Sequence, residues 1–341
     1  MATIKDVARL AKVGVGTASR VISGNGSVAK ETAERVRKAI DQLEFRPSHA
    51  ARSLLSGSSK MIGVYLPLLK GTFYTPILQT IDTELRSNGL HMMVAFGVGE
   101  GDARQQAREG IGFLIERGCD GLLVFSNALN DTDFDEMGPK RGNLIVLNRH
   151  YPNVADQCFT ANHHRGGVLA ARSLLKLGHK SFAVIGGPSS SPDNVDRLSG
   201  FMGELQRNGV DTSCVISIES DFSTKGGWDS AETLMASGRK FTALFCANDE
   251  MAVGALSYLQ QVGIKVPETI SVMGYDNTDS AEYSAPRLTS IHVPWRDITL
   301  NGLHWLMNCC YGSHHRVTRD FRISVTWRAS VAPPRLTGRK R

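Results

Sequence analysis

The strongest constraint on the fold is the way apolar runs and amphipathic stretches alternate from residue 60 onward. The runs are short enough for buried strands, and the stretches between them carry apolar residues at helical spacing. The expected strands form two series, at 61–69, 91–97, 121–125 and 143–148, and then at 181–187, 214–220, 243–249 and 270–276. Strand–helix alternation builds a parallel sheet with helices on both faces. Two series in a chain of 341 residues, which is too long for one core, predict two doubly wound α/β lobes.

The N-terminal residues have a different pattern, which predicts three short helices. Thr3 and Asp6 have the spacing of a capping box at the start of the first helix. The Lys-Val-Gly segment at 12–14 is short enough for a tight turn, and 17–23 and 31–43 carry apolar residues at helical spacing. A tight turn between the first two of three helices is typical of a helix-turn-helix, whose second helix enters the major groove of DNA.

The net positive charge of the chain lies in this N-terminal part. Residues 1–60 contain 11 Lys and Arg against 5 Asp and Glu, whereas the remaining residues contain 28 of each kind. A small basic module on a neutral body indicates a polyanionic partner, although a solvated charged face would have the same composition. No apolar run approaches the ~20 residues of a membrane helix, and the N-terminus lacks the apolar core of a signal peptide. We therefore expect a cytoplasmic protein with no membrane partner.

The segment TIKDVARLAKV…TASRVISGNGSVAKETAERVRKAIDQLEFRPSHAARSL resembles the DNA-binding headpiece of the LacI/GalR family of bacterial transcriptional repressors, without gaps from residue 2 to residue 54. The resemblance implies a helix-turn-helix domain at 1–46. It also implies contacts to DNA bases or phosphates at Thr3, Val15, Gly16, Thr17, Ser19 and Arg20. The guanidinium fork of Arg20 suits guanine O6 and N7, and Val15 can touch a thymine methyl group.

Two glycines depart from the family pattern. Members usually have Ser at position 14, where it caps the recognition helix. Gly14 can occupy the cap position at a loss of only a few tenths of a kcal/mol. Gly16 offers no side chain for base readout and costs about 1 kcal/mol of helix propensity. We expect the headpiece to fold and to read bases mainly through Val15, Arg20 and DNA shape.

Residues 47–59 resemble the hinge helix of this family. In the family this helix folds only on operator DNA, as a pair in a dimer, and inserts an apolar wedge into a central minor-groove step. The resemblance gives the wedge to Leu54 and further DNA contacts to Ser48, Ala51 and Arg52. We therefore expect a homodimer on palindromic operator DNA, although a plain linker with an incidental leucine would have a similar sequence.

Residues 60–335 resemble the effector core of the family, which is like a periplasmic sugar-binding protein. The matching motifs are DRLSGF at 196–201, FCANDEMAVGA at 245–255, VPETISVMGYDN at 266–277 and PRLTSIHVP at 286–294. The resemblance divides the core into an N-lobe of about 60–160 plus 292–322 and a C-lobe of about 161–291 plus 323–335, followed by a basic tail at 336–341. The tail has no leucine heptad, so we do not expect a coiled-coil tetramer.

Ligands of parallel sheets bind outside the carboxyl ends of the strands, where this chain has carboxylate, amide, guanidinium and aromatic side chains. Together with the resemblance, this position gives six expected effector contacts, Phe73, Asn148, Arg197, Phe222, Asn248 and Asp276. Such groups suit a sugar, which needs paired hydrogen bonds and a flat apolar face. Any one of them could instead cap a helix or join the lobes, and Asp249 could equally cap the helix that follows it.

The loop before the DRLSGF motif bears on the class of effector. Purine-binding family members carry an Arg and a Thr there, whereas this chain has PSSSPDNV at 188–195, which favours a sugar over a nucleobase. The usual Asp-Asn pair near a crossover between the lobes is Ala161-Asn162 here. The adjacent histidines at 163–164 and 314–315 lack a third ligand at workable spacing, so we expect surface or pocket-edge histidines and no metal.

An enzyme and a transport protein are the two alternatives. The glycine-rich segment 97–101 lacks the spacing of a dinucleotide loop, and the chain has no G-x-S-x-G or H-E-x-x-H motif. The headpiece and the missing signal peptide argue against a periplasmic transport protein. We therefore predict a sequence-specific transcriptional repressor of carbohydrate-utilisation genes, not an enzyme, which needs no cofactor and is controlled by a sugar or sugar derivative bound between two lobes.

Overall fold

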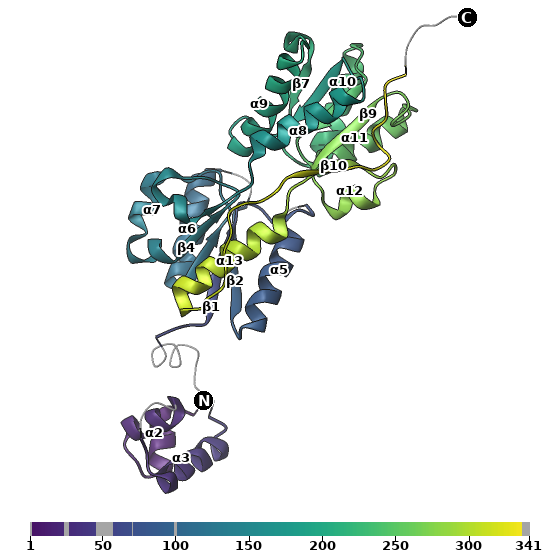
Figure 1. The fold of residues 1–341 in the computed structure, drawn as a ribbon. Coiled ribbons are helices and arrows are strands. Elements are labelled where there is room, and N and C mark those ends of the chain that lie inside the picture. The colour runs from purple at the N-terminus through teal and green to yellow at the C-terminus, as the bar shows by residue number, and fades with distance from the viewer. Residues whose placement is uncertain (1, 24–26, 46–56, 70, 99–100, 336–341) are drawn as a thin grey trace, which may run out of the picture.

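The computed structural model describes residues 2–23, 27–45, 57–69, 71–98 and 101–335. These residues form an all-α headpiece and two lobes built on parallel sheets (Figure 1). No helix in these described ranges is both long and apolar enough to cross a membrane. The expected fold class, a helix-turn-helix followed by two doubly wound α/β lobes, is confirmed.

The headpiece contains helices α1 (Ile4–Leu10), α2 (Val15–Ser23) and α3 (Lys30–Gln42). Thr3 and Asp6 form the expected capping box, in which the Thr3 hydroxyl accepts a hydrogen bond from the Asp6 amide and the Asp6 carboxylate accepts one from the Thr3 amide. Small apolar side chains fill the shared core, namely Val7, Ala8, Ala11, Ala18, Val36 and Ala39. Helix α2 begins two residues earlier than expected, so Gly16 lies inside the helix and not in the turn.

The N-lobe is built on a five-stranded sheet of order β2-β1-β3-β4-β5, in which every neighbouring pair is parallel. Its strands are β1 (Met61–Leu66), β2 (His91–Phe96), β3 (Gly121–Val124), β4 (Leu144–Leu147) and β5 (Cys158–Phe159). In β1, Ile62 lies opposite Met92 of β2 on one side and Gly121 of β3 on the other. This order brings the carboxyl ends of β1, β3 and β4 to one edge of the lobe.

The C-lobe is built on a six-stranded sheet of order β11-β10-β9-β8-β6-β7. Its strands are β6 (Phe182–Gly186), β7 (Ile216–Glu219), β8 (Ala243–Cys246), β9 (Ser271–Asp276), β10 (Thr289–His292) and β11 (Ser324–Thr326). All neighbouring pairs are parallel except β10 and β11, which are antiparallel. The short strands β5, β10 and β11 were not expected from the sequence.

Helices cover both faces of each sheet, as strand–helix alternation requires. In the N-lobe, α5 (Tyr74–Ser87) and α13 (Trp295–Tyr311) share one apolar core, and α6 (Ala103–Glu116) and α7 (Asp131–Glu136) share another. In the C-lobe, α8 (His163–Lys176) and α9 (Pro192–Arg207) lie on one face, and α10 (Thr224–Ala236), α11 (Asp249–Gln261) and α12 (Asp279–Tyr283) on the other. Short 3-10 helices complete the chain at η1 (Gly138–Asn143), η2 (Pro152–Gln157) and η3 (Thr212–Cys214).

Helix α13 belongs to the N-lobe although it follows a strand of the C-lobe. It packs against α5, β3 and β4, and the chain then returns to the C-lobe as β11 (Figure 1). In the described part of the chain, segments 160–162, 293–294 and 312–323 therefore connect the lobes. Helix α13 was not expected from the sequence.

Candidate functional site

A cavity of about 480 Å³ lies between the two lobes. Its lining residues from the N-lobe are Pro67, Leu68, Gly71, Phe73, Tyr74, Asn127 and Asn148. Those from the C-lobe are Asp193, Arg197, Asp221, Phe222, Ser223, Thr224, Lys225, Asn248, Glu250 and Asp276. All six side chains that we expected to contact an effector are therefore brought together at this one cavity, at the carboxyl edges of both sheets.

Three of the expected residues have an unusual backbone conformation. Asn148, Phe222 and Asp276 have φ angles of 62°, 64° and 100°, in the region that L-residues rarely occupy. Such a conformation costs about 1–3 kcal/mol for a residue other than glycine and clusters at binding sites. Asn148 and Asp276 stand at the ends of β4 and β9, where this turn of the backbone directs their side chains toward the cavity.

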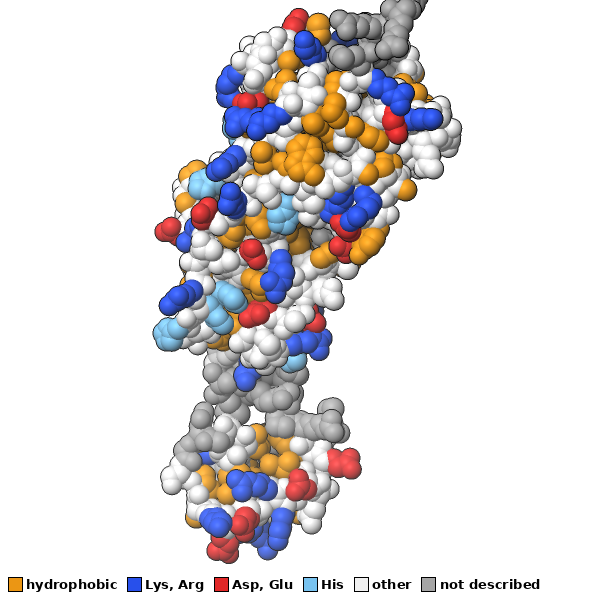
Figure 2. Space-filling view, turned by 45° about the vertical axis from the view of Figure 1, so that its right-hand side comes forward, with side chains coloured by type: hydrophobic (Ala, Val, Ile, Leu, Met, Phe, Trp, Pro, Cys, Tyr) orange, Lys and Arg blue, Asp and Glu red, His pale blue; other side chains and the backbone are white. Residues whose placement is uncertain are grey.

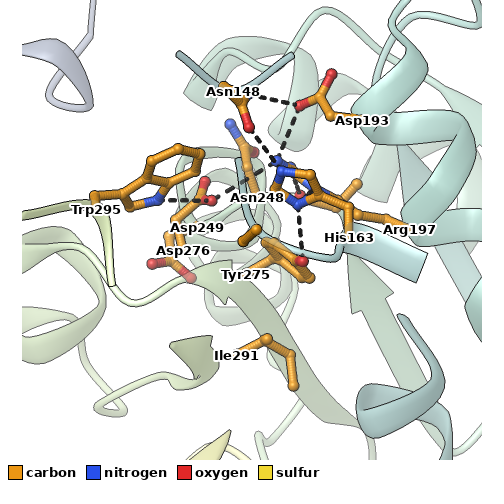
Figure 3. A network of polar contacts seen from close by, with 12 residues as sticks. Asn148, His163, Asp193, Arg197, Asn248, Asp249, Tyr275, Asp276, Ile291 and Trp295 are labelled. Carbon is orange, nitrogen blue, oxygen red and sulfur yellow. Dashed lines mark hydrogen bonds and ion pairs between the residues drawn. The ribbon is translucent and has the colours of Figure 1, made fainter. Parts of the chain in front are cut away.

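Arg197 occupies the centre of a buried polar network (Figure 3). Its Nη2 lies 2.9 Å from Asp193 Oδ2 and 3.9 Å from Asp276 Oδ1, and its Nη1 donates to the carbonyl oxygen of Ala247 at 2.6 Å. The guanidinium also stacks over the ring of Tyr275, 4.2 Å from the ring centroid. Its Nε donates to His163 Nδ1 at 3.4 Å, so all three nitrogens of this side chain, which is only 3% exposed, have an acceptor that fixes the guanidinium.

The two carboxyl groups beside Arg197 differ in protonation. Burial raises the pKa of Asp276 to about 8, because the guanidinium is too distant to offset the loss of water. Burial also acts on Asp193, but the adjacent Arg197 guanidinium outweighs it and keeps the pKa of Asp193 below its ordinary value. At neutral pH Asp276 therefore carries a proton that it can donate, whereas Asp193 is ionised and accepts hydrogen bonds.

His163 is part of the same network, which the sequence analysis did not anticipate. It was expected at the surface or pocket edge, but it is 3% exposed, whereas its neighbour His164 is exposed. Its Nε2 lies 2.6 Å from Asn148 Oδ1, and its Nδ1 lies 3.0 Å from the Tyr275 hydroxyl. Burial and the charge of Arg197 lower the pKa of His163 to about 3, so the imidazole is neutral. A neutral ring that donates from Nε2 to Asn148 fixes the orientation of that amide.

Asn248, and not Asp249, caps the helix that follows them. Asn248 caps α11, with Oδ1 accepting from the Met251 amide at 2.9 Å. Asp249 is fully buried and does not cap the helix, because its carboxylate accepts from the Thr278 amide at 2.7 Å and from the Ser290 hydroxyl at 2.6 Å. Asp249 thus holds the loop after β9, and Asn248 has a structural role in addition to lining the cavity.

Aromatic rings form one wall of the site. Phe73 meets Trp295 edge to face, with centroids 5.0 Å apart, and meets Tyr74 in the same way at 5.0 Å. The indole Nε1 of Trp295 donates to Asp276 Oδ1 at 3.3 Å. The sequence analysis missed Trp295 and Asp193. Asp193 could have been found from its spacing, because it precedes Arg197 by four residues and so lies on the same helical face.

Hydrogen bonds join the lobes across the cavity. Asn127, which follows β3 and was also not predicted, donates to Ser191 Oγ at 3.0 Å, and Asn148 Nδ2 donates to Asp193 Oδ2 at 3.3 Å. At the rim the Thr72 hydroxyl donates to Glu250 Oε1 at 2.9 Å. Both lobes thus contribute groups to one continuous polar surface.

The headpiece exposes four of the six residues that we expected to contact DNA bases or phosphates. Val15 is 44% exposed, and Gly16 and Arg20 are exposed as well, while Thr17 and Ser19 are partly buried. Thr3 has a structural role as the cap of α1. The expected hinge contacts Ser48, Ala51, Arg52 and Leu54 lie outside the described residues. No group of three or more potential metal ligands occurs within the described ranges.

Both parts of the chain match known families. Residues 3–48 match the family described as bacterial regulatory proteins of the lacI family, and residues 171–331 match a periplasmic binding protein-like domain. The HTH-type transcriptional repressor PurR of Vibrio atlanticus (strain LGP32) is 33% identical over 309 residues, which cover 90% of this chain and 91% of the relative.

Solved structures show the same likeness. A transcriptional regulator of the LacI family from Burkhoderia phymatum is 46% identical, with a TM-score of 0.77 over 80% of this chain and 99% of that one. The lac repressor dimer bound to operator and the anti-inducer ONPF is 26% identical, with a TM-score of 0.81 over 97% of this chain and 99% of that one. The chain therefore belongs to the LacI family and is a DNA-binding transcriptional repressor, not an enzyme.

Proposed function

We propose that this repressor controls carbohydrate-utilisation genes and that a sugar or sugar derivative, bound between its lobes, sets its affinity for operator DNA. The observation that carries the proposal is the cavity around Arg197. It combines a fixed guanidinium, an ionised carboxylate at Asp193 and a protonated carboxyl at Asp276 with an aromatic wall. Neighbouring sugar hydroxyls need such paired donors and acceptors, and the sugar ring needs a flat apolar face.

The size and composition of the cavity also support a sugar. A volume of about 480 Å³ falls in the range of small-molecule sites, roughly 300–1,000 Å³. Amide groups of Asn127, Asn148 and Asn248 add both donors and acceptors around the same space. The loop at 188–195 lacks an Arg for a nucleobase and instead supplies Ser191 and Asp193 to the network.

The DNA-bound unit in this proposal is a homodimer on a palindromic operator, acting in the cytoplasm. Two headpieces on a two-fold axis read two half-sites of one palindrome. Exposed apolar side chains gather on the C-lobe face shown in Figure 2, as is typical of a surface that meets a partner. Tyr283 and Trp327 are exposed apolar residues of this lobe, at 83% and 52%.

Closure of the lobes around the sugar would weaken operator binding, so the sugar acts as an inducer. The coupling must be reciprocal, because an effector that lowers DNA affinity is itself bound less tightly by the DNA complex. Both lobes contribute groups to the cavity, so a ligand there biases their relative position.

The test begins with a palindromic DNA fragment that the purified protein selects from genomic DNA. Its affinity is measured across a range of salt, with and without each member of a panel of mono- and disaccharides and with the bases guanine and hypoxanthine. We expect tight, salt-dependent binding that one sugar releases. The matched control is Arg197→Lys, which keeps the charge but loses the fork and should bind DNA without responding to the sugar. Release of the DNA by a purine base would show that the effector is a purine and not a sugar. Tighter DNA binding in the presence of a sugar would show that the sugar is a co-repressor and not an inducer. Selection of no fragment over random DNA would refute it.

A further inference from the structure

One end of helix α13 contacts two residues that line the cavity. Its first residue, Trp295, donates from Nε1 to Asp276 Oδ1 at 3.3 Å and packs edge to face against Phe73, with centroids 5.0 Å apart. Asp276 belongs to the C-lobe and Phe73 to the N-lobe, and both line the cavity. A ligand that engages Asp276 Oδ1 competes for the oxygen that holds Trp295, and any shift between the lobes changes the position of Trp295 relative to one of its two partners.

The other end of α13 is joined through Asp120 to the segment that leads to the headpiece. The hydroxyl of Tyr311, its last residue, donates to Asp120 Oδ2 at 2.9 Å. The Asp120 carboxylate also accepts from the Ser58 hydroxyl at 2.6 Å and from the amides of Ser59 and Lys60 at 2.9 and 2.8 Å. One carboxylate therefore binds both the end of α13 and three consecutive residues that precede β1.

Helix α13 packs closely on the sheet between these two ends. A Cβ atom at Gly302 of α13 would lie 2.8 Å from Cδ1 of Ile145, and one at Gly121, next to Asp120, would lie 2.7 Å from Sγ of Cys310. The helix thus lies directly on β4 and on the start of β3. With 17 residues it is about 25 Å long, and closely packed elements shift as units between discrete positions.

We infer that α13 transmits the state of the effector cavity to the DNA-binding headpiece, and that Tyr311 and Asp120 are the positioning residues through which it acts on residues 58–60. The inference rests on the proposed function, because it requires a repressor whose DNA and effector sites are coupled. By reciprocity, DNA bound at the headpiece changes the affinity of the cavity for its ligand, and if α13 carries this coupling, bound DNA also changes the surroundings of Trp295. That consequence can be tested without knowing the effector.

The experiment uses the full chain labelled with 5-fluorotryptophan. The four tryptophans give four ¹⁹F resonances, and Trp295→Phe identifies the one at the cavity. The probe is the palindromic DNA fragment selected by the protein. In the wild type, we expect saturating DNA to shift the Trp295 resonance. In Tyr311→Phe, which removes one hydroxyl, we expect most of that shift to be lost although the fragment still binds. Asp120→Asn is the second variant and should behave in the same way.

Tyr258→Phe on α11 is the matched control, because it removes a tyrosine hydroxyl in the C-lobe and should keep the full shift. A merely structural Tyr311 would alter the stability of the free protein but leave the DNA-induced shift intact. A wild-type Trp295 resonance that does not respond to bound DNA, or a full response in both Tyr311→Phe and Asp120→Asn, would overturn the inference and leave the proposed function standing. Failure of the wild type to prefer any fragment would instead refute the proposed function.

Discussion

Replacing Gly16 by alanine should stabilise the headpiece. Helix α2 begins at Val15, so Gly16 pays the conformational penalty of glycine inside a helix. A Cβ atom at this position would have no protein atom within 4 Å, so the new methyl group meets no steric conflict. Alanine is favoured over glycine in a helix by about 1 kcal/mol, and nothing in the described headpiece offsets that gain.

Hydrogen exchange on the full chain measures this gain within the headpiece. Amides of α3 near Val36 and Ala39 are held by the shared core, so they exchange when the headpiece opens. A gain of about 1 kcal/mol in the free energy of opening corresponds to exchange about fivefold slower. Gly112→Ala is the matched control, because Gly112 lies within α6 of the N-lobe and is also open to a Cβ atom. It should leave headpiece exchange unchanged.

Unchanged or faster exchange of the α3 amides in Gly16→Ala would refute this reasoning. It would mean that residue 16 is not helical in the free protein and that α2 starts later, as the sequence pattern from residue 17 suggested. The same variant bears on DNA reading, since Gly16 is exposed on the helix expected to enter the major groove.

Three further predictions follow from contacts described above. Thr3→Ala removes the cap of α1 and should destabilise the headpiece by about 1 kcal/mol, which would appear as faster exchange of the same α3 amides. Burial raises the pKa of Asp276 from 3.8 to about 8, so the folded protein keeps a proton that the unfolded chain releases, and the stability due to this carboxyl falls as pH rises through that window. The urea midpoint of Asp276→Asn should therefore rise relative to that of the wild type between about pH 4 and pH 8 and level off above, whereas a constant difference would show that Asp276 is ionised throughout. Glu250→Gln weakens the acceptor that holds Thr72 across the rim and should lower affinity for the releasing sugar in calorimetry while leaving affinity for DNA in the absence of sugar unchanged.

The two-lobe architecture could be predicted from sequence because strand and helix have different periods and alternate in this chain. Helix α13 was not predicted because many of its residues are poor helix formers. Its sequence, WRDITLNGLHWLMNCCY, includes Thr, Asn, Gly, His and Cys at interior positions. Packing against α5, β3 and β4 overrides that weak propensity, and packing of this kind is not visible before the sheet is assembled. The helix to which we assign the coupling is therefore one that propensity does not reveal.

The six cavity-lining residues that we expected to contact an effector were predicted from the family resemblance together with a rule of position, because ligands meet parallel sheets at the carboxyl ends of the strands. The rule does not predict which residues lie behind those that line the cavity and hold them in place. His163 and His164 look equivalent in sequence, yet α8 begins at His163, and successive helical residues point about 100° apart. One imidazole therefore turns into the network and the other toward Ser199 at the surface.

The charges at the cavity argue for an uncharged effector. Arg197 is neutralised by Asp193 at 2.9 Å, and Asp276 is protonated at neutral pH. The second cation among the described lining residues, Lys225, is exposed and already paired with Asp229 at 2.5 Å. A phosphorylated sugar would thus bring a charge that, among the described lining cations, only Lys225 could neutralise after leaving Asp229, so part of the cost of its desolvation would go uncompensated. An uncharged sugar meets only hydrogen-bonding groups whose partners its hydroxyls can replace, so we expect the phosphorylated form of the releasing sugar to leave the repressor on its DNA.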